Sequence, residues 1–438
     1  MTLARPEAAD ETSPRKLLAL AIPTILLGAC AAGILWVIEK VADQWQQTLW
    51  DRIPDALGVD PSGWWIILVL TLTGLAVGLC LQFFPGHGGP DSATTELIEE
   101  PLHLSALPGV IAVTILALGG GVSLGPENPI IAVNVAIIVF LLSRLIPAVP
   151  SEVGVMIAGA ATVGALFGTP VAAALIFTEV LAAIAGKGSL WDKLFLPLVA
   201  AGSGTIAMKW MGGQHLGFNL PAYGSPSAPD LLYGILVACA GVAIGLAMLY
   251  LFSFTWRALH SMRSRILIPL VGGLILGILG FIGGPITMFK GLAETGQLLA
   301  DPAGYSRSEL TLIIVIKALA LAIAASALFR GGRIFPATFL GVAVGLLGHA
   351  MIPNLPLTLA VACGVLGVLL VVSRDGWLAL FVAVAIPGDI TVLPVLCVVV
   401  LPAWLLVTRQ PEFRIMPEPA TPAASPPADA APEARSAE

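Results

Sequence analysis

The sequence predicts an all-α polytopic membrane protein, and three observations support this prediction. Of the 438 residues, 57% are hydrophobic and only 11% are charged, against about 25% charged in an ordinary globular protein. The mean hydropathy is +0.95. Apolar runs of about 20 residues, the length that crosses a bilayer as a helix, recur along the chain. We therefore expect one membrane domain in a lipid bilayer and find no support for binding to nucleic acid.

Several apolar runs are long enough to span a bilayer as single helices. They are Leu17 to Ile38, Trp64 to Phe84, Val153 to Phe177, Leu231 to Phe252, Ile266 to Ile286 and Leu310 to Phe329. Other runs are shorter or are interrupted by Gly and Pro. The first run is too long for the apolar core of a signal peptide, so we interpret it as the first membrane helix.

Charged residues predict the orientation, because cytoplasmic loops of membrane proteins are enriched in Lys and Arg. Basic residues near both ends and in the segment 256–265 place the termini and this loop in the cytoplasm, with the chain in the plasma membrane. The linker 211–230 has no Lys or Arg and is expected outside. The halves 15–210 and 231–410 are then predicted to have opposite topology. Such inverted halves bind their solute near the mid-plane, at the ends of broken helices.

The predicted domain organisation is simple. Residues 1–14 form a cytoplasmic N-terminal segment, and residues 15–414 form the membrane domain. Residues 415–438 form a Pro/Ala-rich cytoplasmic tail whose composition is typical of disorder.

Three Gly/Pro interruptions are candidates for broken helices that hold a solute. They are "PGHGGPD" (85–91), "LGPENP" (124–129) and "FRGGRIFP" (329–336), each followed by a run of helix length. A helix N-terminus leaves N–H groups unpaired and carries about half a positive charge, which makes it an anion site. Several such ends would hold a small anion by their partial charges. Full positive charges would bind the anion too tightly for rapid release.

Glu127 is an acidic residue between two prolines in an apolar neighbourhood. An acidic residue at mid-helix costs roughly 2.5 kcal/mol or more on membrane-insertion scales. At the end of a broken helix its carboxylate can occupy an anion site, and protonation would release it. The simpler interpretation is that Glu127 only caps a re-entrant helix.

These motifs resemble those of the CLC chloride channels and chloride/proton exchangers. "GPENP" (125–129) is similar to the family's Gly-Lys/Arg-Glu-Gly-Pro, and "GHGGP" (86–90) is similar to its Gly-Ser-Gly-Ile-Pro. "GRIFP" (332–336) is similar to Gly-x-Phe-x-Pro, with the aromatic residue displaced by one. The segment 166–180 resembles the family helix that ends in paired acidic residues, and "QPEF" (410–413) resembles the segment that holds the inner-gate tyrosine.

The resemblance implies a CLC-like inverted-repeat fold with re-entrant, broken helices that meet at the membrane mid-plane, and a homodimer with one anion pathway per subunit. It implies gating roles for Glu127 and Phe413 and a proton route at Glu179 and Val180. It also implies anion binding at three groups of residues. These are Gly86, His87 and Gly88; Gly125, Asn128, Pro129 and Ile130; and Gly332, Arg333, Ile334 and Phe335. The bound solute is chloride or another small monovalent anion, with no cofactor.

Departures from the family pattern bear on mechanism. Val180 stands where exchangers have the inner proton-transfer glutamate, which argues against tight proton coupling. His87 stands at the family's serine, and Phe413 has the ring of the tyrosine without its hydroxyl. Protonation of His87, with an unperturbed pKa of about 6.5, would strengthen anion binding at low pH. Arg333 adds a fixed positive charge, so selectivity can have shifted away from chloride.

Plainer interpretations stand beside these roles. His87 can be a loop histidine in water, Arg333 can extend to the membrane interface, and Glu179 can be a structural partner of a basic residue. Lys317 lies mid-span and needs a partner, for which a structural salt bridge is the simpler expectation. Asp389 is expected to cap the helix that follows it.

The sequence therefore predicts transport of a small monovalent anion, most of all chloride, through a Glu127-gated pathway that is channel-like or weakly coupled to protons. A proton-coupled antiporter of chloride or fluoride is the alternative, with Glu179 on the proton route. An intramembrane enzyme is a distant alternative, because the chain has no HExxH motif. Its five scattered histidines predict no metal centre. We expect a transporter and not an enzyme.

Overall fold

The computed structural model describes residues 14–95, 97, 99–147, 149–183, 189–213 and 216–415. Within these residues the chain is helical, and its sole β-type pairing is an isolated bridge between Gly125 and Gly332. The predicted tail and N-terminal segment lie almost wholly outside the described residues.

The helices fall into two series. The first series is α1 (Pro14–Gln47), η1 (Thr48–Arg52), α2 (Ile53–Leu57), α3 (Trp65–Phe83), η2 (Pro85–Gly88), η3 (Leu104–Ala106), α4 (Leu107–Gly119), α5 (Glu127–Leu145), α6 (Ser151–Phe167), α7 (Pro170–Ala183) and α8 (Leu190–Trp210). The second series is α9 (Ala228–His260), α10 (Leu267–Gly283), η4 (Pro285–Thr287), α11 (Leu292–Ala300), α12 (Arg307–Ser326), α13 (Ile334–Met351), α14 (Leu357–Ser373), α15 (Gly376–Ala385), η5 (Ile390–Val392) and α16 (Leu393–Val407).

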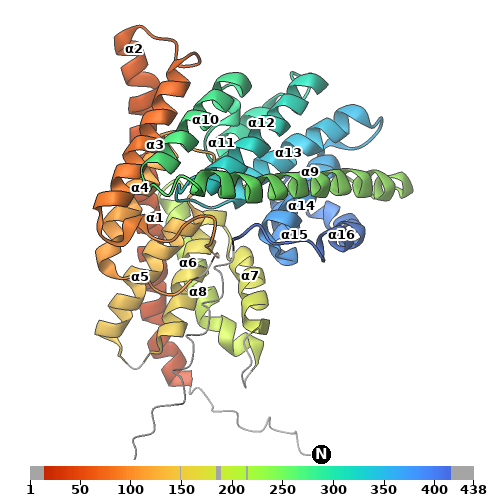
Figure 1. The fold of residues 1–438 in the computed structure, drawn as a ribbon. Helices are drawn as coiled ribbons and strands as arrows, with labels where there is room; N and C mark the ends of the chain where they lie inside the picture. The colour runs from red at the N-terminus through yellow and green to blue at the C-terminus, as the bar shows by residue number, and fades with distance from the viewer. Residues whose placement is uncertain are drawn as a thin grey trace, which may run out of the picture.

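The two series repeat one packing pattern. In the first, α6 packs against α1, α5, α7 and α8; in the second, α14 packs against α9, α13, α15 and α16. In Figure 1 the first series, red to yellow-green, lies to the left of and below the second series, green to blue. The matching contacts confirm the repeat that the sequence predicts. The helices α5 and α13, which follow two of the Gly/Pro interruptions, therefore occupy equivalent positions in the two series.

Close backbone contact between α3 and α10 joins the two series. A Cβ added at Gly74 would collide with the carbonyl of Pro269, and one added at Gly273 would collide with that of Leu70. Small residues allow membrane helices to approach so closely. The two helices lie side by side (Figure 1) and hold the halves in register.

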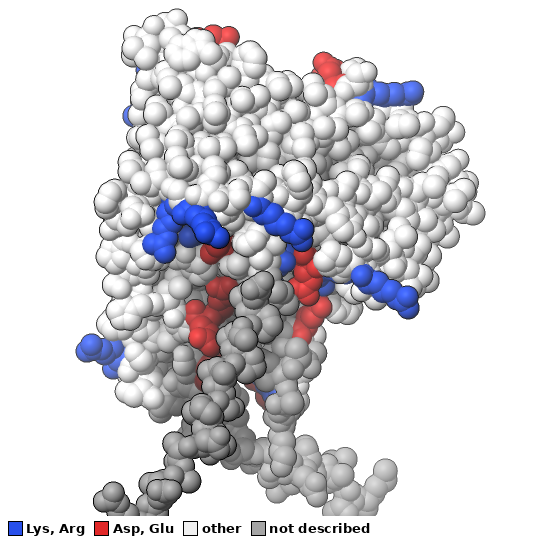
Figure 2. Space-filling model, viewed as in Figure 1, with Lys and Arg blue, Asp and Glu red and all other residues white. Residues whose placement is uncertain are grey.

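Length and composition make the chain a multi-pass membrane protein. Among the described residues, 7 helices are long and apolar enough to cross a membrane, and α4, α6, α7, α10, α14 and α15 are shorter apolar helices. Figure 2 shows that charged side chains form small separate groups on the visible face, which is otherwise uncharged.

The prediction of a single span from Val153 to Phe177 is wrong. The helix α6 ends at Phe167, Gly168 has φ +69°, and α7 begins at Pro170. A glycine in the left-handed region ends a helix without Cβ strain, and proline is favoured at the first helical position. The apolar run contained this break in "GTP", which its overall hydropathy concealed.

Lys317 is fully buried, and backbone oxygens bind its charge. Its Nζ donates to the carbonyls of Met288 and Phe289 at 2.9 Å each and to that of Thr287 at 3.2 Å. The ammonium also lies 4.9 Å from the ring centre of Phe339. Among the described residues no carboxylate forms an ion pair with it. The expected salt bridge is thus replaced by three carbonyls of one loop.

Candidate functional site

The site begins with two glycines, one from each half of the chain. The N–H of Gly125 donates to the carbonyl of Gly332 at 2.8 Å, and the N–H of Gly332 donates to that of Gly125 at 2.7 Å. This pair of bonds holds two Gly/Pro interruptions against each other. The N-termini of α5 and α13 therefore meet at one place.

Glu127, the first residue of α5, lies at this meeting point with no exposed surface. Its Oε1 accepts a hydrogen bond from the backbone N–H of Phe335 at 2.8 Å. The amide of Ile334 also faces the carboxylate. A carboxylate from the first half thus occupies the N-terminus of α13 in the second half, where unpaired N–H groups favour an anion. Among the described residues, Oε2 has no hydrogen-bond partner.

The lack of side chains at Gly125 and Gly332 makes room for this carboxylate. A Cβ built on either glycine would collide with Oε2 of Glu127. Neither glycine has a positive φ, so the requirement is space for the carboxylate and not an unusual backbone conformation. The sequence analysis placed both glycines at the anion site, and the structure puts them on either flank of Glu127.

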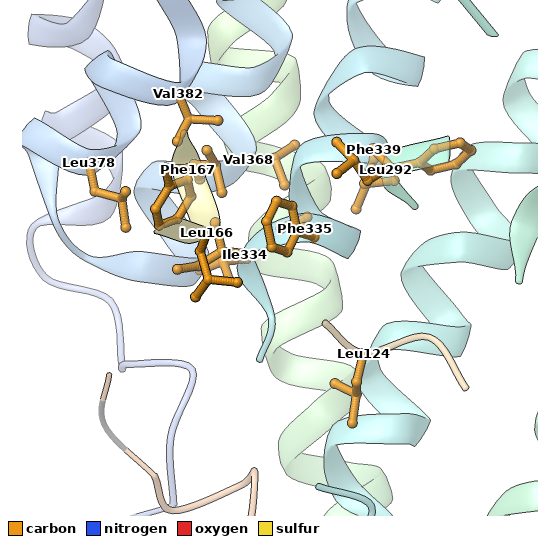
Figure 3. Packing of buried hydrophobic residues seen from close by; sticks show 14 of the residues in the cluster. Leu124, Leu166, Phe167, Leu292, Ile334, Phe335, Phe339, Val368, Leu378 and Val382 are labelled. Carbon is orange, nitrogen blue, oxygen red and sulfur yellow. The ribbon is translucent and has the colours of Figure 1, made fainter. Parts of the chain in front are cut away.

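Side chains pack closely around the start of α13. Figure 3 shows Ile334 and Phe335 beside Leu166 and Phe167, which come from the end of α6. The rings of Phe167 and Phe335 stack with their centres 5.8 Å apart. This apolar packing excludes water from one side of the Glu127 site.

Two small cavities adjoin the site. The first, here called the Arg330 cavity, has a volume of about 20 Å³, and it is lined by Gly88, Pro90, Ser92, Thr95, Val110, Asn128, Pro129, Ala132, Arg330 and Gly331. The second, here called the Lys290 cavity, has a volume of about 10 Å³, and it is lined by Leu35, Glu39, Ala165, Leu166, Met208, Lys290, Leu292 and Phe335. Each has room for about one water-sized particle.

Arg330 fixes the loop that forms one wall of its cavity. It is 8% exposed; its Nε donates to the carbonyl of Gly88 at 3.1 Å, and its Nη2 donates to that of His87 at 3.3 Å. Its Nη1 pairs with Asp91 at 3.4 Å. The Ser92 hydroxyl accepts from the N–H of Gly331 at 2.9 Å. These bonds tie the loop after α3 to the start of α13.

The His87 side chain lies outside this cavity. Its ring contacts the carbonyl of Leu81 and the Nη1 of Arg265, at 3.1 Å each. The residue is exposed and has φ +51°, with Gly86 and Gly88 at φ +72° and +71° on either side. Gly88 lines the Arg330 cavity, whereas His87 contributes only its carbonyl, through Arg330.

Arg333 and Phe413 lie together. The Arg333 guanidinium is 5.2 Å from the ring centre of Phe413, within cation–π distance. Phe413 is 1% exposed and stacks on Phe252 with ring centres 4.5 Å apart. Arg333 Nη2 donates to the carbonyl of Thr95 at 3.3 Å, while its buried Nη1 has no partner among the described residues. An unpaired buried guanidinium N–H is suited to an anion.

The first turn of α5 contributes lining surface to the Arg330 cavity more than it contributes backbone N–H donors. Asn128 and Pro129 line the Arg330 cavity, but proline has no N–H to donate. The amide of Ile130 donates to the carbonyl of Pro126 at 3.1 Å. In this conformation the Phe335 amide that donates to the Glu127 carboxylate comes from α13.

The predicted proton-route residues lie on α7, away from Glu127. Glu179 is exposed, Val180 is half-buried, and the Glu179 carboxyl group lies close enough to Asp375, the N-cap of α15, to interact with it. Burial first, and then the neighbouring Glu179 carboxyl group, raise the pKa of Asp375 to about 7, although its Oδ1 accepts from the N–H of Leu378 at 2.8 Å.

The sequence analysis missed several polar residues of the site: Glu39, Ser92, Thr95, Lys290, Arg330 and Asp375. Arg330 lies three residues before Arg333 in the quoted "FRGGRIFP", so that motif gave a signal for it. Glu39 and Lys290 are 251 residues apart and belong to no motif. The expected cap at Asp389 is confirmed, because its carboxylate accepts from the N–H of Thr391 at 2.9 Å.

Comparison with known proteins agrees with this architecture. The family model described as "Voltage gated chloride channel" matches residues 73–408. The "Putative ion-transport protein YfeO" of Escherichia coli (strain 55989 / EAEC) is 46% identical over 402 residues, which are 92% of this chain and 96% of that protein.

Solved structures share the fold at low sequence identity. A "CLC-type fluoride/proton antiporter" has a TM-score of 0.72 at 20% identity, over 91% of this chain and 97% of that one. A "slow cyanobacterial Cl-/H+ antiporter" has a TM-score of 0.72 at 19% identity, over 90% of this chain and 94% of that one. The matched residues include both glycines and Glu127, and the chain therefore belongs to the voltage gated chloride channel family of anion transport proteins.

Proposed function

We propose that this protein moves a small monovalent anion, chloride above all, along a pathway that passes the N-terminus of α13 and is gated by Glu127. The observation that carries the proposal is the bond from the Phe335 N–H to the Glu127 carboxylate at 2.8 Å. That carboxylate is a tethered anion on a helix N-terminus. A free anion competes with it for the same N–H groups.

Opening requires Glu127 to leave the N-terminus of α13. A proton that neutralises the carboxylate removes the charge that holds it there, whereas a free anion displaces the charged carboxylate from the N–H groups. Backbone dipoles carry only partial charges, so the anion that replaces Glu127 is bound loosely enough to leave. The anion is the solute, and no cofactor takes part in the proposal.

On the side of the Arg330 cavity, Arg333 and Phe413 form the next contact. The buried Nη1 of Arg333 is unpaired among the described residues and offers a donor to the anion. The ring of Phe413 covers the guanidinium and limits its movement. We propose that Phe413 acts here as an apolar constriction, while Arg333 provides the charge.

Coupling to protons is proposed to be weak. Val180 has no titratable group at the place where the resembling exchangers have a glutamate. Fixed stoichiometric exchange needs a proton acceptor on each side of the anion site, and Glu127 supplies only one of them.

A proton-coupled antiporter of chloride or fluoride is the second candidate, and one contact favours it. The neighbouring carboxyl groups of Glu179 and Asp375 offer a proton acceptor on the elements α7 and α15. Two solved relatives of this fold are described as antiporters, one for fluoride and one for chloride. In this case Glu179 and Asp375 together replace the glutamate missing at position 180.

The test is ion flux from liposomes that contain the purified protein and are loaded with chloride or fluoride, with internal pH recorded. We expect chloride efflux with little proton movement from the wild type and a changed rate from Glu127→Gln. Proton counterflow in fixed ratio to the anion, abolished by Asp375→Asn, would establish the antiporter instead. Absence of flux for both anions, with no effect of Glu127→Gln, would refute anion permeation.

We also propose a homodimer in the plasma membrane, with both termini in the cytoplasm. Large apolar side chains, among them Trp191, Trp210, Leu401 and Leu405, are exposed on α8 and α16 and need lipid or a second copy to cover them. Mass measurement of the solubilised protein tests the dimer.

A further inference from the structure

We propose a second anion site at Lys290, in the Lys290 cavity, that Glu39 occupies when no anion is bound. The inference rests on the proposed function, because it concerns how an anion reaches Glu127. The Lys290 side chain would bind a small monovalent anion when the Glu39 carboxylate moves away. The pathway would then contain two positive sites in series, each blocked by a carboxylate of the protein.

The ion pair lies in the wall of the cavity. Lys290 Nζ and Glu39 Oε1 are 2.9 Å apart, and each side chain is 17% exposed. Both residues line the cavity, together with the apolar residues Leu166, Leu292 and Phe335 (Figure 3). A charged pair in such a setting is partly shielded from water, so its charges act more strongly than those of an exposed pair. An anion entering the cavity meets one positive group, Lys290.

Phe335 links this cavity to the Glu127 site. Its side chain lines the Lys290 cavity, while its N–H donates to Glu127 Oε1. An anion released by Lys290 therefore lies beside Phe335, the residue whose N–H binds the Glu127 carboxylate. An anion would therefore occupy the Lys290 cavity before it reaches the N-terminus of α13.

The backbone that carries Lys290 is held in place. Lys317 binds three successive carbonyls, and the last of them belongs to Phe289. The N–H of Phe289 donates to the carbonyl of Gly121 at 3.1 Å, and Gly291 has φ +92° with the Phe339 side chain against the place of its missing Cβ. The buried charge at Lys317 thus has a function, because it fixes the loop that presents Lys290.

The charges around Lys290 come from several elements. Glu39 is on α1, Glu127 on α5, Glu294 on α11 and Lys317 on α12. Lys290 is close enough to Glu127 and Glu294 to interact electrostatically with both carboxylates. Glu294 is buried, and its Oε2 has no hydrogen-bond partner among the described residues. Lys290 is therefore attracted by three carboxylates, and Glu39 is the one in contact.

The cavity is assigned to the outer side by its neighbours. Met208 lines it and lies just before the linker 211–230, which the charge distribution places outside. In the same region the Phe218 ring of that linker lies against Gly296 of α11. By contrast, Arg265 of the basic segment 256–265 contacts His87, beside the Arg330 cavity.

The experiment measures the initial rate of chloride uptake into liposomes against chloride concentration, and chloride binding to the solubilised protein by calorimetry. We expect Lys290→Met to raise the half-saturating concentration about fivefold and Glu39→Gln to lower it about fivefold, the range expected for an ion pair near the surface. Lys290→Arg retains the charge and should stay within about twofold of wild type. The double variant with Lys290→Met and Glu39→Gln should have the same half-saturating concentration as Lys290→Met alone, because without the Lys290 charge there is no anion site for Glu39 to block.

Lys40→Met is the matched control. Lys40 is next to Glu39 on α1 and carries the same charge, but it pairs with Asp43 at 3.8 Å on an exposed surface. Its removal should leave the half-saturating concentration unchanged.

Unchanged concentration dependence and unchanged binding in Lys290→Met, with flux intact, would overturn the Lys290 site and leave the proposed function standing. Weaker binding in Glu39→Gln, equal to that in Lys290→Met, would also overturn it, because the pair would then only join α1 to the loop. If the wild-type protein showed no anion flux, both the proposed function and the Lys290 site would be overturned.

Discussion

Replacing Glu127 with alanine should tighten anion binding at the N-terminus of α13. The carboxylate accepts the N–H of Phe335 at 2.8 Å in a fully buried place. A hydrogen bond to a charged group contributes about 1.5–3 kcal/mol. A free anion gains this interaction once it has no tethered competitor. At about 1.4 kcal/mol per tenfold change in affinity, the dissociation constant should fall roughly 10- to 100-fold.

Calorimetric titration of chloride into the purified protein measures this change. Glu127→Gln should give a smaller gain than Glu127→Ala, because the neutral amide still offers an acceptor worth about 0.5–1.5 kcal/mol. Glu152→Ala is the matched control, since Glu152 is also a glutamate in the first turn of an apolar helix but is exposed. Equal dissociation constants for wild type and Glu127→Ala would refute the reasoning, because the carboxylate would then not occupy the anion site.

Two further substitutions test the parts of the structure that support this site. Gly332→Ala adds a methyl group where Oε2 of Glu127 lies and should displace the carboxylate. Chloride flux in liposomes should therefore increase. Gly202→Ala is the control, because Gly202 lies on α8 with open space at its Cβ, and it should leave flux unchanged. Lys317→Met leaves three buried carbonyls without their donor and should lower stability by about 3 kcal/mol or more, seen as a lower midpoint of thermal unfolding, whereas Lys40→Met should not. A midpoint for Lys317→Met equal to wild type would show that the loop 287–289 is held without it.

The site joins groups that the chain keeps far apart. The Phe335 amide and the Glu127 carboxylate are 208 residues apart, and Lys290 and Glu39 are 251 apart. In both contacts the carboxylate comes from the first half and the group that binds it comes from the second half. Such complementarity needs the two halves to pack with opposite orientation, as the inverted repeat provides.

The sequence was sufficient for properties that depend on local pattern. Low charge and long apolar runs predict a membrane protein because the bilayer admits few other structures than apolar helices. The three Gly/Pro interruptions indicate broken helices, and a lone carboxylate in apolar surroundings indicates a functional group at Glu127. Each signal lies within one continuous segment of the chain, so no tertiary contact is needed to recognise it.

Length alone misled the prediction where a break was short. The run from Val153 to Phe177 is apolar throughout, and one glycine with φ +69° divides it into α6 and α7. Hydropathy averages over such a break, because it records the polarity of the residues and not the backbone conformation of Gly168. The same limit applies to Lys317, whose three carbonyl partners come from a loop about 30 residues earlier.

The sequence by itself determined the class of protein, the apolar runs and the three interruptions, and it singled out Glu127 as a candidate site residue. Only the tertiary structure decided which helix end Glu127 occupies, that the His87 ring points toward Arg265, and that Lys290 faces Glu39 beside Phe335. The physical reason is that helix-forming and membrane-inserting tendencies are local, whereas hydrogen bonds and ion pairs between the two halves depend on where packing brings distant groups. The Glu127 contact belongs to this second kind, because its carboxylate comes from one half of the chain and the Phe335 amide that binds it comes from the other.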